Sequence, residues 1–370
     1  MRRSELDFIL SKMLESQQEV SDLNFTVDKP LQVESFGELV PVTLDPPLGN
    51  LTPFQTEMIA LNLIGGNRRL TEDLLRTGSC DASYTLSNKA RFRVNVFSQR
   101  ANYSIVLRKL NTQIPTMEDL CMPEIFQEVP KEKTGLILVT GATGSGKSTT
   151  LAAIVDYCNK NRRDHIITVE DPIEFVHESK NCLVNHREVG VHTKSFSAAL
   201  RGALREDPDV VLIGEMRDLE TIELALTAAS TGHLVFGTLH TQSAAKTVDR
   251  IIDVFPAEQQ NKIRATLSES LKGVVAQNLF KRIDKKGRVA AMEILVFTTA
   301  IANLVREGKT HQIPGMIQVG KKLGNQPLDD AIMEHLRHAR ISPEEAYDKA
   351  IDKKKFRPFL KEPPMDGTDE

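Results

Sequence analysis

Polar and apolar residues alternate through much of the first third of the chain. The alternation predicts short strands with one buried and one solvated face, over residues 21–27, 31–42, 81–86, 91–97 and 104–110. Apolar residues three and four apart predict helices over residues 6–14 and 52–63, the second capped by Thr52 with Pro53 at its first position. We therefore expect residues 1–112 to form an α+β domain, an antiparallel sheet with helices on one face.

Beyond residue 133 the pattern changes to short, uninterrupted apolar runs separated by amphipathic segments. The runs are typical of buried parallel strands and cover residues 135–140, 165–169, 209–214 and 233–238. Helical spacing appears between them, over residues 149–159 and 195–206. This alternation indicates an α/β domain built on a parallel sheet. Further along we expect only helices that cap the domain, over residues 257–276, 298–307, 312–322, 328–338 and 343–350.

The segment between these two patterns, residues 113–132, contains three prolines and is predicted to be a linker with one short helix. The α/β domain then spans residues 133–361. The last residues, 362–370, are rich in proline and acidic side chains. That composition predicts a disordered tail.

The composition fits a soluble protein with two domains, since a single core is not expected at 370 residues. A net charge of −3, without a strongly basic block, disfavours a nucleic-acid partner. No apolar run reaches the roughly 20 residues that a membrane span needs, and the N-terminal segment is amphipathic rather than a signal peptide. The four cysteines form no C-x-x-C pair, which gives no support for zinc and suits free thiols in a reducing cytoplasm.

The loop after the first apolar run has the pattern G-x-x-x-x-G-K-S, in the strand–loop–helix context that a P-loop requires. Gly144 and Gly146 let the backbone wrap a phosphate, and the amides at the helix start donate to its oxygens. Lys147 reaches the β- and γ-phosphates, and Ser148 can bind Mg²⁺. The pattern predicts a nucleoside triphosphate site formed by Gly141, Ala142, Thr143, Gly144, Ser145, Gly146, Lys147, Ser148 and Thr149.

Acidic residues follow two later apolar runs. Glu170, Asp171 and Glu174 follow one run, where a carboxylate can hold a water or Mg²⁺ against the γ-phosphate, although a polar loop cap would give the same pattern. Glu215 ends the next run, as in a Walker B motif, whose acid supports Mg²⁺ or polarises the attacking water. The two acidic positions indicate that the predicted site also hydrolyses its nucleotide.

Two histidines and three arginines are further candidates. His233 and His240 bracket an apolar run that ends at the predicted phosphate edge, where they could sense the γ-phosphate or a neighbouring subunit, although single histidines are usually structural. Arg91, Arg93 and Arg108 lie on the predicted strands of the first domain. From the alternation alone, these arginines belong to the solvated face of a half-buried sheet.

The motifs together resemble the secretion ATPase superfamily, and most of all its type IV pilus retraction ATPases. The Walker A loop, the acidic Val169–Glu174 segment, the Walker B segment 206–221 and the histidine-bearing segment 232–241 occur in the family's order. Smaller similarities lie at residues 21–23, 91–93, 117–120 and 300–313. Two positions depart from the family pattern: Ala302 stands where an arginine is usual, and Asn24-Phe25 where a His-Leu pair is common.

The resemblance implies a PAS-like N-terminal domain and a RecA-like ATPase domain, assembled as a homohexamer with ATP and Mg²⁺. It implies that Glu174 is the general base, that Ser148 and Glu215 support the metal, and that His233 and His240 couple nucleotide state to domain position. It also implies that Arg91, Arg93 and Arg108 face the nucleotide of a neighbouring subunit. The implied location is cytoplasmic, at the pilus base, against an inner-membrane platform protein.

Three alternative functions remain beside a retraction motor. A pilus assembly or type II secretion ATPase usually carries a tetracysteine zinc element and a longer N-terminal region. A nucleotide-binding accessory subunit with weak turnover would keep the P-loop. A DNA-handling RecA-like enzyme is disfavoured, since the chain lacks stretches of basic and aromatic residues.

Overall fold

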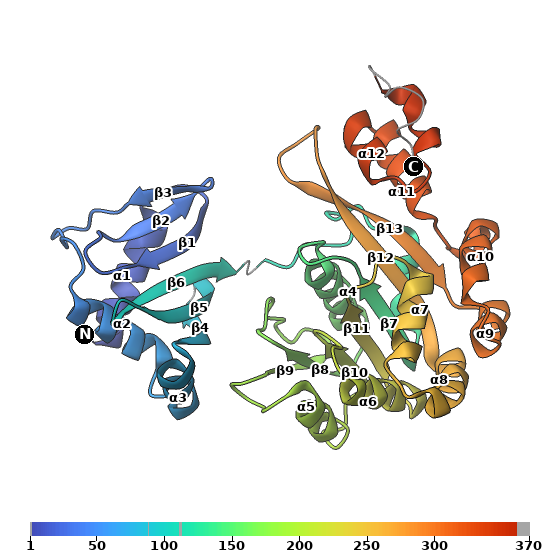
Figure 1. Cartoon of the computed structure of the whole chain (residues 1–370), viewed down its shortest axis with the longest axis horizontal. Helices are drawn as coiled ribbons and strands as arrows, with labels where there is room; N and C mark the ends of the chain where they lie inside the picture. The colour runs from blue at the N-terminus through green and yellow to red at the C-terminus, as the bar shows by residue number, and fades with distance from the viewer. Residues whose placement is uncertain (1, 88, 111–112, 361–370) are drawn as a thin grey trace. The chain divides into compact units, whose positions relative to one another are not determined.

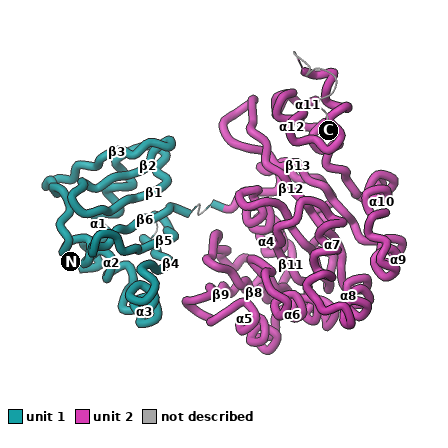
Figure 2. The backbone as a smooth tube through the Cα atoms, viewed as in Figure 1, with its two compact units in different colours: residues 1–113 teal, residues 114–370 magenta. Residues whose placement is uncertain are grey.

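The computed structural model describes residues 2–87, 89–110 and 113–360. The chain divides into two compact units, Met1–Gln113 and Ile114–Glu370 (Figure 2). The predicted disordered tail, residues 362–370, lies outside the described residues.

The first unit is an α+β domain around a six-stranded sheet in the order β3-β2-β1-β6-β5-β4, in which every neighbouring pair is antiparallel (Figure 1). Its strands are β1 (Val20–Phe25), β2 (Gln32–Ser35), β3 (Glu38–Pro41), β4 (Ser79–Leu86), β5 (Ala90–Gln99) and β6 (Asn102–Leu110). Its helices are α1 (Arg3–Glu15), α2 (Pro53–Ile64) and α3 (Arg68–Thr77). The predicted antiparallel sheet is thus confirmed, whereas α3 was not predicted.

One face of this sheet is buried against the helices. Phe92, Val94 and Val96 alternate along β5 and join the core that α1, α2 and α3 complete. At the start of α2, the Gln55 amide donates to Thr52 Oγ1 at 3.3 Å, and the Thr52 amide donates to the Gln55 side chain at 2.8 Å. This capping box satisfies backbone donors that a helix start otherwise leaves unpaired.

The second unit contains a seven-stranded sheet in the order β13-β12-β7-β11-β10-β8-β9. All neighbouring pairs are parallel except β12 with β13. The strands are β7 (Gly135–Thr140), β8 (His165–Glu170), β9 (Leu183–Glu188), β10 (Val210–Ile213), β11 (Leu234–Leu239), β12 (Leu271–Lys281) and β13 (Arg288–Val296).

The longer helices of this unit are α4 (Lys147–Asn161), α5 (Phe196–Ala203), α6 (Leu219–Ser230), α7 (Ala244–Asp253), α8 (Ala257–Ser270), α9 (Thr299–Arg306), α10 (Ile313–Val319), α11 (Leu328–Arg337) and α12 (Pro343–Lys349). The 3₁₀ helices are η1 (Glu124–Lys131), η2 (Thr310–Gln312), η3 (Lys321–Leu323), η4 (Lys353–Lys355) and η5 (Arg357–Phe359). In β7, Leu136 and Leu138 pack with α6, α7 and α8, while Ile137 and Val139 pack with α4 and η1. Both faces of the sheet are therefore covered by helices, and this burial explains why its strands are apolar without alternation. The predicted α/β domain is confirmed.

The prediction of a helix over residues 257–276 is wrong beyond Ser270. There α8 ends, and β12 begins at Leu271 beside β7 (Figure 1). The β-branched Val274 and Val275 are both buried, as in a strand covered on both faces. The antiparallel hairpin β12–β13 was therefore missed, and so was the edge strand β9, whose sequence is mostly polar.

The segment treated as a linker, residues 113–132, falls almost wholly within the second unit. Met117 and Phe126 are buried in the same apolar cluster as Leu151 and Ile154 of α4. Arg162, at the end of α4, donates a hydrogen bond to the carbonyl oxygen of Pro130 at 3.1 Å. These contacts make the segment a structural part of the α/β unit.

Among the described residues, no helix has the length and apolar character needed to cross a membrane.

Candidate active site

Four loops that leave the carboxyl ends of parallel strands carry the predicted site residues of the second unit, except His233. The P-loop follows β7, Glu174 lies beyond β8, Glu215 follows β10 and His240 follows β11. Because these strands are parallel neighbours, their carboxyl ends share one edge of the sheet, where ligands of open α/β sheets bind.

The P-loop folds tightly between β7 and α4. Gly141 has a φ of +144°, and a Cβ there would lie 2.5 Å from the Gln277 carbonyl oxygen. Gly146 has a φ of +87° and immediately precedes α4. Both positions therefore favour glycine, and the loop leads directly into the amides at the start of α4, where anions bind readily.

Lys147 spans the loop. Its Nζ donates to the carbonyl oxygens of Gly141 at 3.0 Å and Ala142 at 3.1 Å. Burial lowers the pKa of the Lys147 ammonium, while the charges of Glu215 and Glu174 act to raise it. The structure thus brings Lys147 within electrostatic reach of both predicted carboxylates.

Glu215 is held by two side chains. Arg217 Nη2 lies 2.6 Å from Glu215 Oε2, and His240 Nε2 lies 2.9 Å from Glu215 Oε1. The hydrogen bond from Arg217 holds the pKa of the Glu215 carboxyl below its usual value. Sequence reasoning missed Arg217, although its position two residues after the Walker B acid was the available signal.

Glu174 and Glu170 occupy different surroundings. The Glu174 side chain is exposed, and its backbone amide donates to Glu170 Oε2 at 3.4 Å. Glu170 is mostly buried and lines a small cavity of about 20 Å³ together with Ser148. The acidic segment after β8 therefore presents one exposed carboxylate and one that lies beside the P-loop serine.

Ser148 and Glu215 offer oxygen ligands, which Mg²⁺ prefers. No group of three or more His, Cys, Asp or Glu residues in the described ranges is arranged to hold a metal. Mg²⁺ commonly takes only one or two protein ligands and completes its shell with substrate phosphates and water. The residues at this edge therefore fit Mg²⁺ bound together with a nucleotide.

His233 does not join this edge within its own subunit. It precedes β11, and its carbonyl oxygen accepts a hydrogen bond from the Gly135 amide at the start of β7. Its ring Nδ1 lies 3.0 Å from the Ala228 carbonyl oxygen. A six-residue strand spans about 20 Å, so His233 and His240 lie at opposite edges of the sheet. The two histidines thus bracket β11 as expected, and their roles in sensing the nucleotide or a neighbouring subunit stay predictions.

The three arginines share the face of the first sheet that points away from its core. Arg93 of β5 pairs with Arg108 of β6, and Arg91 is two residues from Arg93. Arg108 Nε lies 3.0 Å from Oδ1 of the buried Asp22. Arg93 is about half exposed, with its Nε 4.0 Å from Asp81 Oδ1. Arg108 is therefore anchored within its own domain more firmly than Arg93.

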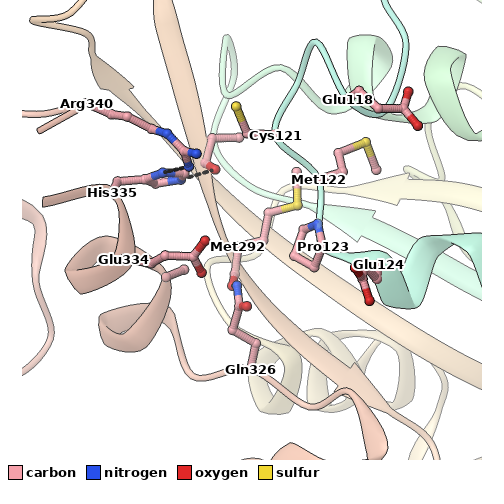
Figure 3. A pocket seen from close by; sticks show the side chains of 12 residues that line it. Glu118, Cys121, Met122, Pro123, Glu124, Met292, Gln326, Glu334, His335 and Arg340 are labelled. Atoms are coloured by element: carbon pink, nitrogen blue, oxygen red, sulfur yellow. Dashed lines mark hydrogen bonds between the residues drawn. The ribbon is translucent and has the colours of Figure 1, made fainter. Parts of the chain in front are cut away.

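A separate cavity of about 400 Å³ lies between the segment of residues 113–132, called the connector below, and the elements β13 and α11 (Figure 3). Arg340 and His335 meet on one side of it, where Arg340 Nη1 lies 3.2 Å from His335 Nδ1 (Figure 3). His335 Nε2 donates to the Ala290 carbonyl oxygen at 3.0 Å, and burial lowers the pKa of the ring. None of the lining residues belongs to the P-loop or its carboxylates, so this cavity is not the phosphate site.

Comparison with known proteins identifies the family. Residues 77–346 match the family described as type II/IV secretion system protein. The chain belongs to this family. It is 51% identical over 336 residues to a type IV pilus retraction ATPase, PilT, of Pseudomonas aeruginosa, covering 90% of this chain and 95% of the relative. It is 54% identical over 266 residues to a twitching motility protein of Neisseria gonorrhoeae, covering 72% and 71% of the two chains.

Structural comparison agrees with these matches. The chain superposes on the crystal structure of the pilus retraction motor PilT with bound ADP, with a TM-score of 0.85 and 43% sequence identity. The match covers 94% of this chain and 98% of the other. The resemblance to secretion ATPases of the retraction type, drawn from the motifs, is confirmed over nearly the whole chain.

Proposed function

We propose that this protein is an ATP-hydrolysing motor that powers retraction of type IV pili and so twitching motility. The observation that carries the proposal is the gathering of Lys147, Glu174 and Glu215 at one edge of the parallel sheet, where both carboxylates act electrostatically on the lysine. The similarity to retraction ATPases along nearly the full chain selects the kind of work.

Each residue of this edge has a distinct part in ATP hydrolysis. The P-loop amides and Lys147 bind the phosphates and orient the γ-phosphoryl group. Ser148 and Glu215 hold Mg²⁺, which when bound neutralises charge that develops on the phosphates. The exposed Glu174 carboxylate takes the proton of the attacking water as general base. His240, bonded to Glu215, is placed to respond to the state of the nucleotide.

The assembled motor is proposed to be a homohexamer in which Arg91, Arg93 and Arg108 of one subunit serve the nucleotide of its neighbour. Their shared exposed sheet face supports this assignment. The ring would act in the cytoplasm, at the pilus base, on the inner-membrane platform protein.

Deletion of the gene, followed by counting surface pili and scoring twitching, tests the direction of the work. Excess pili without movement would support retraction, and bald cells would instead assign the protein to assembly. Complementation with Glu174→Gln separates a motor from an accessory subunit. A motor requires hydrolysis, so that variant should leave twitching defective, whereas full rescue would favour the accessory role.

A further inference from the structure

Gln277 is a buried amide in an otherwise apolar part of β12. Only 2% of it is exposed, and Val274, Val275 and Ala276 before it are all buried. Buried polar side chains are retained at a cost unless they make hydrogen bonds. The contacts of Gln277 therefore indicate what it contributes.

The side chain of Gln277 is hydrogen-bonded to the P-loop. Gln277 Nε2 donates to the backbone carbonyl oxygen of Ser145 at 2.6 Å. The side-chain Nε2 also lies 3.2 Å from where a Cβ on Gly146 would stand, and the backbone carbonyl oxygen of Gln277 lies 2.5 Å from where a Cβ on Gly141 would stand. The side chain of Gln277 thus contacts the middle and the end of the phosphate-binding loop, and the backbone at the same position lies against its beginning.

Two buried polar atoms beside this hydrogen bond have no hydrogen-bond partner among the described residues. Ser145 Oγ and Gln277 Oε1 are both buried, and neither makes a hydrogen bond with any described residue. The Ser145 carbonyl oxygen is therefore linked to β12 through the hydrogen bond from Gln277 Nε2. Because the loop amides can bind phosphate only in one backbone arrangement, a side chain that fixes Ser145 also fixes those amides.

We propose that Gln277 is a positioning residue for nucleotide binding, which holds the P-loop in the conformation that receives the phosphates. It acts through Ser145 and touches no reacting atom. This inference rests on the proposed use of the P-loop for ATP.

The test compares binding of a fluorescent ADP analogue and steady-state ATP hydrolysis in full-length protein. Gln277→Met keeps the length of the side chain and removes the donor. Gln277→Glu keeps its shape but places an acceptor against the Ser145 carbonyl. Both should weaken nucleotide binding and raise KM by about tenfold, the usual worth of a buried hydrogen bond, with a smaller change in kcat.

Asn278→Ala, in the adjacent position whose side chain points to the other face of β12, is the matched control and should bind as the wild type does. If either Gln277 variant folds and binds the nucleotide with wild-type affinity, the positioning role is overturned. If the wild type itself binds no nucleotide, the ATPase assignment fails instead. Gln277 variants that kept kcat/KM but lost thermal stability would show a purely structural role and would equally overturn the proposal.

Discussion

At the scale of single residues, the two predicted carboxylates of the phosphate edge differ in how they are held. Glu215 is bonded to Arg217 and His240, and its lowered pKa favours a carboxylate that stays ionised. The exposed Glu174 side chain makes no hydrogen bond or ion pair with any described residue. A fixed anion suits metal support, whereas a free carboxylate can accept a proton and release it again.

This contrast leads to a prediction for Glu174→Gln. The variant should still bind ATP with Mg²⁺, because the phosphate grip lies in the P-loop. Its turnover should fall by about 10² to 10⁴, the usual contribution of a general base. Nucleotide affinity and steady-state hydrolysis of the purified protein measure both quantities. Turnover close to that of the wild type would remove Glu174 from this role.

His177 gives the fold a pH dependence. Its ring is buried beside His186, and burial lowers its pKa from 6.5 to about 4. Between these values the unfolded chain takes up a proton that the folded chain does not, so the free energy of unfolding should fall as the pH drops from 6.5 to 4. Other groups that act on the ring are Glu170, Asp156 and Lys180.

We expect this histidine to account for about 3 kcal/mol of stability lost over that interval. Urea unfolding at pH 7 and pH 5 should show a smaller loss for His177→Gln than for the wild type. His338→Gln, at an exposed position, is the control and should follow the wild type. An equal pH response in all three proteins would contradict the assignment.

At the scale of elements, a helix or strand could be predicted where the residues that determine it are neighbours in the sequence. The P-loop, the strand before it and the helix after it follow from one continuous stretch of sequence. The hairpin β12–β13 does not, because Leu267, Leu271 and Val274 keep a helical spacing across the true end of α8. Only the pairing of β12 with β7, more than a hundred residues earlier, turns this segment into a strand.

In the candidate site, too, residues identified by a local motif could be predicted, whereas those identified by a distant contact could not. The acids at the ends of β8 and β10 were predictable, since each follows an apolar run directly. Gln277 was not, because its contact with Ser145 joins positions 132 residues apart. The two histidines share a segment, yet they fall at opposite edges because a strand of six residues separates them.

The connector offers a test at this scale. Phe126 of η1 is 3% exposed and packs into the cluster under α4. Phe126→Ala should destabilise the second unit by about 3 to 5 kcal/mol, as large-to-small changes in a core do. Gln127→Ala, at the exposed neighbouring position, should change stability by no more than about 0.5 kcal/mol. Chemical denaturation measures both, and equal stabilities would mean that the segment is a passive linker.

At the scale of the whole molecule, the proposed motor requires an active site shared between subunits. The edge of the second sheet supplies a lysine and carboxylates, and its arginine, Arg217, is engaged with Glu215. An arginine supplied by another subunit can contribute about 10³ to 10⁵ in rate to phosphoryl transfer. Arg93 is less constrained than Arg108, since its Nε lies 4.0 Å from Asp81 Oδ1, whereas Arg108 Nε lies 3.0 Å from Asp22 Oδ1.

We therefore expect Arg93→Ala to fold normally and to lose most of its ATPase activity. Mixing it with the inactive Glu174→Gln protein should restore part of that activity. At equal amounts, about one interface in four joins an intact Glu174 to an intact neighbouring Arg93, if the subunits mix at random in a closed ring. Mass spectrometry of the rings would establish that the two variants co-assemble. The wild-type protein diluted with Glu174→Gln serves as the reference for activity per intact interface. If the co-assembled mixture is as inactive as each variant alone, Arg93 does not act on its neighbour's nucleotide.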